Sequence, residues 1–188
     1  GDVRPDSRAA VRRVDRVDEL AGAGLGLRLA ERTVVGCVLG AHGGDLGFLD
    51  GDELFVTGRA KDLIIVRGQN LYPQDIERAV EADNAVVRSG RVVAFALEVA
   101  GEEGIAVAAE VNPRVQKLIE PASVCGEIAD RVAQHFGEPP KLVLLLKPAS
   151  IPLTSSGKLQ RSACKQSWLE RRFEVIATHG QGAEHSAV

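Results

Sequence analysis

The chain has 188 residues, of which 45% are hydrophobic and 26% charged, with a formal net charge of -3. This composition is typical of a globular protein with one ordinary domain and an extension. The slightly acidic balance gives no reason to expect nucleic acid or an anionic membrane as a partner. No apolar run approaches the roughly 18 residues of a membrane-spanning helix, and the Arg-rich start is not a signal peptide. We therefore expect a cytoplasmic protein without a membrane span.

Three cysteines, Cys37, Cys125 and Cys164, are widely spaced and odd in number. They form no CxxC pair, the spacing that zinc sites and redox motifs share. We therefore expect reduced thiols, with neither a metal site nor a disulfide framework.

Residues 1–43 differ in composition from the rest of the chain. They hold seven arginines and no lysine, whereas all six lysines lie from Lys61 onward. Valines at three-residue spacing predict a charged helix near residues 8–20. A GC-rich coding sequence read in a shifted frame would yield such Arg, Ala, Gly and Val runs. We leave this segment unassigned and expect it to be non-native or poorly packed.

From Gly44 onward the chain alternates short apolar runs with helical patterns. Five runs are expected to be strands: 53–56, 63–66, 92–99, 105–111 and 141–146. Helices are expected to begin at Pro73 and Pro121, because proline is favoured in the first turn, and a last helix follows a loop at 148–158. The resulting order, ββ-α-ββ-α-β-loop-α, predicts a small α+β domain.

Two motifs precede the first of these helices. The segment 44–47 reads GDLG, which by itself is an ordinary turn. The segment 58–62 reads GRAKD and is followed by Arg67-Gly68; by itself it is a charged strand edge.

Two further motifs lie at helix starts. The segment 72–77 reads YPQDIE, with carboxylates in the first turn, where the helix dipole favours them. The segment 152–161 reads PLTSSGKLQR and places Lys158 on a Ser/Gly-rich loop that we expect to move freely. A flexible ammonium group suits phosphate chemistry, although the GxxxxGK[ST] spacing of a P-loop is absent.

In this order and at these separations, the four motifs resemble one family, the adenylate-forming acyl ligases. In that family a GD turn ends the large N-terminal domain, a GRxK/D hinge begins the small C-terminal domain, and a PxTxxGKxxR loop ends it. The string from Gly58 to Glu77, GRAKDLIIVRGQNLYPQDIE, is most like the fatty acyl-AMP ligase branch. Residues 87–96 fit the same branch.

The resemblance covers residues 44 to about 176 and implies a domain organisation. Residues 44–57 would end the large adenylation domain. Residues 58–176 would form the C-terminal AMP-binding lid domain, with a short β-hairpin, a three-stranded sheet and flanking helices. Residues 177–188 would be a flexible tail.

The resemblance also implies roles for five residues at matching motif positions. Lys158 would be catalytic, stabilising negative charge as the acyl carboxylate attacks the α-phosphate. Asp45 would accept hydrogen bonds from the ATP ribose hydroxyls, and Arg59 would add a ribose or phosphate contact. Lys61 would be the hinge on which the small domain rotates. Gly68 would lie in the acceptor channel, where glycine permits close approach of a pantetheine arm.

The implied function is that of the lid of an ATP-dependent fatty acid adenylating ligase, whose acyl-AMP passes to an acyl carrier protein. ATP would be required, with Mg²⁺ bound mainly by the large N-terminal adenylation domain. The sequence departs from the family in lacking that domain, and Ala41-His42-Gly43 stand where the family has an aromatic residue and TGD. We therefore expect the isolated chain to be inactive.

Three alternatives stay open on the sequence alone. The chain could be an acyl-CoA synthetase lid with CoA as the acceptor. It could be a module that binds carrier proteins without catalysing a reaction. It could also be a truncated gene product.

Overall fold

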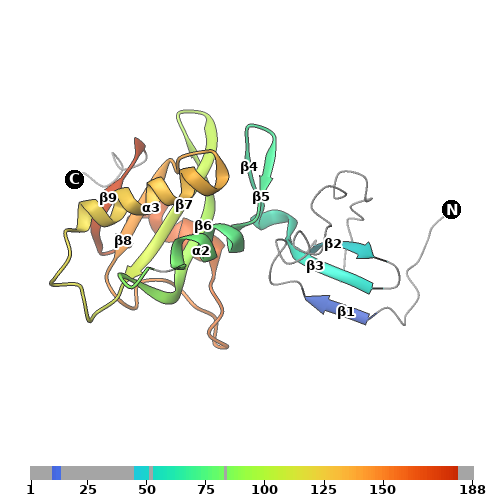
Figure 1. Cartoon of the computed structure of the whole chain (residues 1–188), viewed down its shortest axis with the longest axis horizontal. Coiled ribbons are helices and arrows are strands. Elements are labelled where there is room, and N and C mark those ends of the chain that lie inside the picture. Colours follow the sequence, from blue (N-terminus) through green and yellow to red (C-terminus); the bar gives the residue numbers. More distant parts are fainter. Residues whose placement is uncertain (1–9, 14–44, 51–52, 83, 182–188) are drawn as a thin grey trace. The chain divides into compact units, whose positions relative to one another are not determined.

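The computed structural model describes residues 10–13, 45–50, 53–82 and 84–181, and describes side chains only from residue 59 onward (Figure 1). The chain divides into two compact units, Gly1–Lys61 and Asp62–Val188. Each unit contains its own sheet.

The first unit holds a three-stranded sheet. Its strands are β1 (Ala10–Arg13), β2 (Asp45–Asp50) and β3 (Glu53–Arg59), in the order β1-β3-β2. Strands β2 and β3 are antiparallel, with a register shift between Leu46 and Gly47, and β1 runs parallel to β3.

The helix predicted near residues 8–20 is wrong at residues 10–13, which form β1. Valine is β-branched and suits a strand, and pairing with β3 supplies hydrogen bonds that a local sequence pattern does not reveal. The rest of that predicted helix lies outside the described residues.

The second unit is built on a four-stranded sheet in the order β6-β7-β8-β9. Its strands are β6 (Val87–Val99), β7 (Glu102–Val111), β8 (Leu142–Leu146) and β9 (Val175–His179). The pairs β6–β7 and β8–β9 are antiparallel, and β7–β8 is parallel. The α+β prediction is confirmed, but the sheet has a fourth strand. The tail expected from residue 177 overlaps β9, and residues 182–188 lie outside the described part of the chain.

Helices cover both faces of this sheet because its strands alternate apolar side chains between two cores (Figure 1). One face packs against α2 (Pro73–Glu81) and α3 (Pro121–Phe136) through Ile76, Val80, Ile128 and other buried residues. The other face packs against α4 (Arg161–Leu169) through Cys164 and Trp168.

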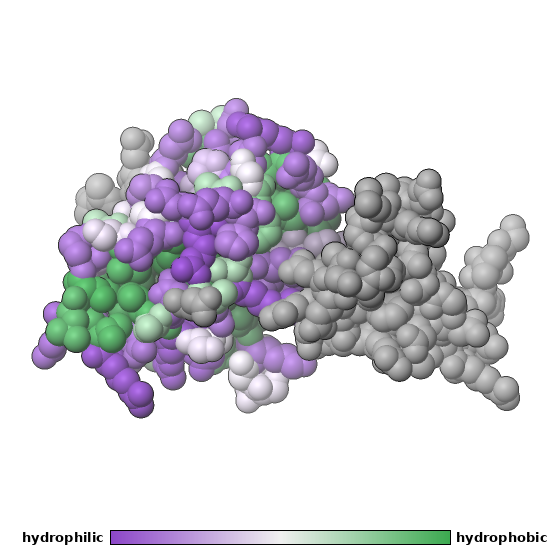
Figure 2. Space-filling model, viewed as in Figure 1, coloured by the Kyte–Doolittle hydropathy of each residue, from purple (hydrophilic) through white to green (hydrophobic). Residues whose placement is uncertain are grey.

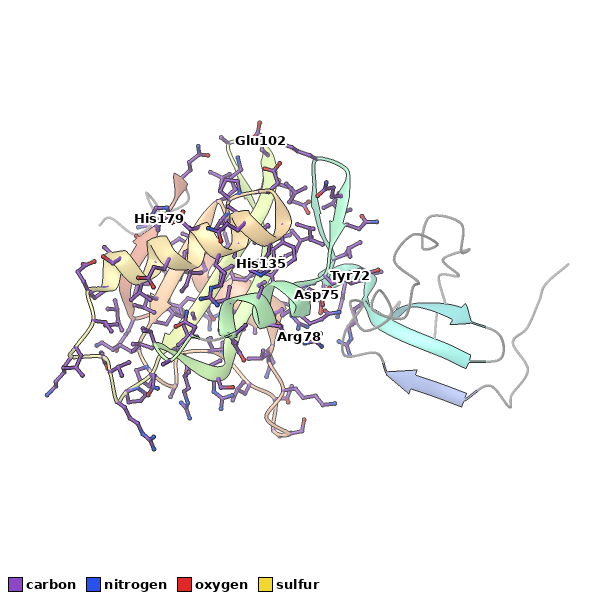
Figure 3. All side chains as sticks on the ribbon, viewed as in Figure 1. Tyr72, Asp75, Arg78, Glu102, His135 and His179 are labelled. Carbon is purple, nitrogen blue, oxygen red and sulfur yellow. The ribbon has the colours of Figure 1, made fainter. Side chains whose placement is uncertain are left out.

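The predicted helix starts at Pro73 and Pro121 are confirmed. Gly137, with a φ of 75°, caps the end of α3. Figure 3 labels Tyr72 and Asp75 at the start of α2 and Arg78 in its last turn. At the start of the helix, the Asp75 amide donates to the Tyr72 carbonyl at 3.0 Å.

A short hairpin precedes α2. It consists of β4 (Ile64–Val66) and β5 (Gln69–Leu71), joined by the two-residue turn Arg67-Gly68. The one-turn 3₁₀ helix η2 (Ala60–Asp62) leads into it.

The face of the second unit seen in Figure 2 is mostly hydrophilic, with a hydrophobic area beside the helices. Leu118, between β7 and α3, is 82% exposed. Within the described ranges, no helix has the length and apolar character needed to cross a membrane.

Candidate active site

Lys158 lies on a short hydrogen-bonded turn between β8 and α4. Leu153 and Leu159 face each other as an antiparallel bridge and close the turn. Inside the turn, the Thr154 amide donates to the Lys158 carbonyl at 2.8 Å, and the Gly157 amide donates to the Thr154 carbonyl at 2.9 Å. The backbone on either side of the lysine is therefore hydrogen-bonded within the turn.

Side chains reinforce this turn. The Lys158 amide donates to Thr154 Oγ1 at 3.0 Å, and that oxygen lies 2.9 Å from Ser156 Oγ. Gly157 has a φ of 80°, a backbone conformation that glycine adopts without steric cost. The Lys158 side chain is exposed. The loop expected from the sequence is thus a hydrogen-bonded turn that presents an exposed ammonium group.

Arg161, the last residue of the lysine motif, begins α4 and makes a two-pronged ion pair with Glu77 of α2. Its Nε and Nη2 atoms donate to Glu77 Oε1 and Oε2 at 2.8 and 2.7 Å. The Glu77 carboxylate also accepts from the Ala94 amide of β6 at 3.1 Å. Glu77 is therefore an anchor between elements and not only a carboxylate near a helix start.

Asp62 adds a third partner to this cluster, with Oδ2 at 3.5 Å from Arg161 Nη1. Burial opposes the charged guanidinium, but hydrogen bonding to Glu77 and the charges of Glu77 and Asp62 outweigh it and raise the pKa of Arg161. Arg161 therefore stays charged.

Glu110 is a second buried carboxylate beside the turn, and the sequence reasoning missed it. It lies on β7 with 0% relative exposure. Its Oε1 accepts from the Ile151 amide at 2.9 Å, and its Oε2 lies 3.3 Å from Arg88 Nη1. The signal was one charged residue in the apolar run IAVAAEV, since charges are almost never buried without partners.

Asp45 and Arg59 both belong to the first unit, and its sheet brings them together. They are Cα partners at the end of the β2–β3 ladder. Arg59 is exposed and makes an interaction with a neighbouring group. Their adjacency suits two residues that would contact one ligand.

Lys61 is exposed and lies within η2. The division between the two compact units falls directly after it. A hinge is expected at a junction where few contacts cross the chain.

Gly68 lies at the tip of the β4–β5 turn and not on a strand. Gly68 and Arg67 have φ values of 79° and 48°, the pattern of a type I′ hairpin turn. A Cβ atom on Gly68 would meet nothing within 4 Å. The turn conformation therefore explains this glycine without reference to an acceptor.

Cys125 and Cys164 are both free and buried. Burial raises the pKa of the Cys125 thiol to about 11 and that of Cys164 to about 12. Both thiols are therefore protonated and unreactive at neutral pH. Cys37 lies outside the described residues. Among those that are described, no group of three or more His, Cys, Asp or Glu side chains could hold a metal ion.

Known proteins similar to this chain are adenylating ligases. The medium-chain-fatty-acid–[acyl-carrier-protein] ligase JamA of Moorena producens is 49% identical over 127 residues, which cover 68% of this chain and 22% of JamA. The long-chain-fatty-acid–AMP ligase FadD26 of Mycobacterium marinum is 36% identical over 137 residues, which cover 71% of this chain and 23% of FadD26. The chain thus spans less than a quarter of these relatives.

Solved structures give the same result. A structure of fatty acyl-adenylate ligases from E. coli and L. pneumophila matches with a TM-score of 0.55 and 35% identity, over 68% of this chain and 22% of that one. The McyG A-PCP complex with phenylalanyl-adenylate matches with a TM-score of 0.60 and 30% identity, over 67% of this chain and 20% of that one. No protein-family model matches the chain.

In fold and in sequence this chain resembles the C-terminal domain of the adenylate-forming acyl ligases. Within that superfamily it resembles the fatty acyl-AMP ligase branch, as the motifs predicted.

Proposed function

We propose that this chain is the lid of a fatty acyl-AMP ligase, which works with a large adenylation domain to activate a fatty acid as acyl-AMP. The observation that carries the proposal is the Lys158 turn, an ordered backbone that presents one exposed ammonium group. The names of JamA and FadD26, both fatty acid ligases, support the same class of substrate.

In this proposal Lys158 acts through its charge. When bound, ATP supplies the adenylyl group that activates the fatty acid. The Lys158 ammonium would lie beside the negative charge that develops around the α-phosphate, and a cation already in place stabilises such charge without reorganisation. The hydrogen bonds between the Lys158 backbone and Thr154 would limit the positions that the ammonium group can occupy.

The other predicted site residues would bind ATP, allow the domain to rotate, or lie beside the acceptor. Asp45 and Arg59, neighbours across β2 and β3, would bind the ribose and a ribose or phosphate oxygen of ATP. Lys61 would absorb the backbone rotation between the two half-reactions. Gly68 would lie beside the acceptor thiol at the tip of the hairpin. Mg²⁺ would be held mainly by the large domain.

The acceptor has two candidates. JamA is named for transfer to an acyl carrier protein, which we propose for this chain. The Mycobacterium leprae relative fadD21, 38% identical over 140 residues, is named as a fatty-acid–CoA ligase. Supplying each acceptor separately to a fused enzyme and measuring thioester formation would decide between them.

The test of Lys158 uses a fused protein. In it, the large domain of JamA, without the last part that corresponds to residues 44–57, is joined to this chain at Gly44. Lys158→Ala should reduce fatty-acid-dependent pyrophosphate exchange by at least ~10²-fold, because one such stabilising group is typically worth ~3 kcal/mol. Lys117→Ala is the control, since Lys117 is also an exposed lysine but lies outside the motifs. Exchange near the wild-type rate in the Lys158 variant would remove this residue from the mechanism.

A further inference from the structure

Buried carboxylates hold the Lys158 turn at both of its ends. Before the turn, the Ile151 amide donates to Glu110 Oε1 at 2.9 Å. After the turn, Arg161 donates to both oxygens of Glu77 at 2.8 and 2.7 Å. The segment that carries Lys158 is therefore tied to the domain at two points outside its own hydrogen bonds.

Glu110 uses both of its oxygens. While Oε1 accepts from Ile151, Oε2 lies 3.3 Å from Arg88 Nη1 and 3.9 Å from Arg91 Nε. Both arginines lie in the stretch of β6 between Val87 and Val92, where the register against β7 shifts. Burying a carboxylate opposes folding, and an apolar residue would fill the position without that cost. The carboxylate thus contributes a directed bond that an apolar side chain lacks.

The Glu77–Arg161 pair also has contacts with other parts of the domain. Its carboxylate also accepts from the Ala94 amide in β6, and Arg161 reaches Asp62 at the start of the second unit. Between them, the two anchors join the turn to the neighbouring strands β6 and β7. A displacement of the turn relative to the sheet would break charged hydrogen bonds in a buried setting, where such bonds are strong.

We propose that Glu110 and the Glu77–Arg161 pair are positioning residues that fix the Lys158 turn relative to the sheet. None of them needs to touch a substrate. They act through Lys158, whose charge stabilises the reaction only if the ammonium is already in place when charge develops. The inference rests on the catalytic role proposed for Lys158.

The first test measures hydrogen exchange in the full 188-residue chain. In Glu110→Leu, the amides of the turn, residues 154–160, should exchange at least about tenfold faster, while those of α3 stay within about twofold of wild type. Glu110→Gln keeps an acceptor oxygen and should restore much of the protection. Glu98→Leu, a change at an exposed glutamate of β6, is the control and should leave the turn unchanged.

Two results would overturn the anchoring itself. One is unchanged exchange of the turn in Glu110→Leu. The other is equal acceleration in the turn and in α3, which would make Glu110 a residue of global stability only.

The second test uses the fused protein with the JamA large domain. Glu110→Leu should lower kcat for acyl-AMP formation by about tenfold with little change in KM, and leave transfer from supplied acyl-AMP to the acceptor unaffected. In the Lys158→Ala background the same change should cause no further loss, because Glu110 acts only through Lys158. Losses that multiply would contradict a positioning role.

The two proposals can fail separately. If Lys158→Ala has no effect on adenylation, the proposed function of Lys158 fails, and hydrogen exchange still decides whether the carboxylates hold the turn. If Lys158→Ala abolishes adenylation but Glu110→Leu affects neither exchange nor kcat, only the positioning inference fails.

Discussion

A glycine can be required at a position because its φ is positive or because a side chain would not fit. At Gly68 only the first reason applies. Its φ is 79°, and a Cβ atom there would meet nothing within 4 Å. The family resemblance assigns this glycine to an acceptor channel, whereas the hairpin requires it for a turn with two positive φ values. Both roles can hold at once, and they predict different measurements.

Gly68→Ala should destabilise the chain by about 1 kcal/mol, because a Cβ atom disfavours positive φ. Gly126→Ala is a matched control: Gly126 lies within α3 and also has open space around its Cβ position. Alanine there should be neutral or stabilising by up to about 1 kcal/mol. Urea unfolding of both variants measures the difference, and a neutral Gly68 variant would contradict the turn explanation. A selective loss of acceptor transfer in the fused protein would support the channel role.

The buried thiols predict a loss of stability at alkaline pH. The unfolded thiol has a pKa near 9.0, whereas burial raises that of Cys164 to about 12, with the charge of Glu77 adding to the effect. Below pH 9 the thiol is protonated in both the folded and the unfolded chain, so this source of stability is fully present. Above pH 9 only the unfolded chain loses the proton, so stability should fall by up to about 1.4 kcal/mol per pH unit until the folded thiol also ionises.

Urea unfolding at pH 8 and pH 10.5 measures this loss. Cys164→Ala should be less stable than wild type at pH 8, because it removes buried contacts, but should lose less stability between the two pH values. Equal losses in the variant and the wild type would show that this thiol is not protected as its burial implies.

At the scale of elements, the hinge proposed at Lys61 has the clearest consequence. The chain divides directly after Lys61, which lies in a single 3₁₀ turn. Lys61→Pro restricts φ there and should reduce transfer to the acceptor thiol in the fused protein at least about tenfold more than it reduces adenylation. Lys61→Ala, which leaves φ free, should have little effect on either step. Equal loss in both half-reactions would favour a direct contact over a hinge.

The elements that could be predicted have strong local signals. Pro121 and the spacing of Val124, Ile128 and Val132 define α3. The buried run of β8 is apolar throughout, and that of β7 is apolar apart from Glu110. Strand β9 was missed because Val175–His179 is short and only half-buried, and its partner β8 lies far away in the sequence. The sequence provides no local signal for such a pairing.

The candidate site likewise contains residues that could be predicted from the sequence and residues that could not. The motif residues Asp45, Arg59 and Lys158 could be found by their order and spacing. The buried partners Glu77–Arg161 and Glu110 could not be paired from the sequence, because their contacts join residues 84 and 41 positions apart. What could have been noticed is a glutamate in an otherwise apolar strand.

At the scale of the whole molecule, our proposal gives the described residues only part of an active site. They contain one exposed lysine on an ordered turn and a neighbouring pair, Asp45 and Arg59, in the other unit. The chain spans 22% of JamA and 23% of FadD26. Most of the rate of adenylation should come from holding the reacting groups in line, in addition to stabilising charge. Under our proposal, that alignment comes from the large domain.

Fatty-acid-dependent pyrophosphate exchange, measured for this chain alone and for its fusion to the JamA large domain, tests the account most directly. We expect no exchange above background from the chain alone, with medium- or long-chain acids, and clear exchange from the fusion. Acyl-AMP formation by the isolated chain would contradict the account. So would an inactive fusion whose large domain remains active with the native JamA lid.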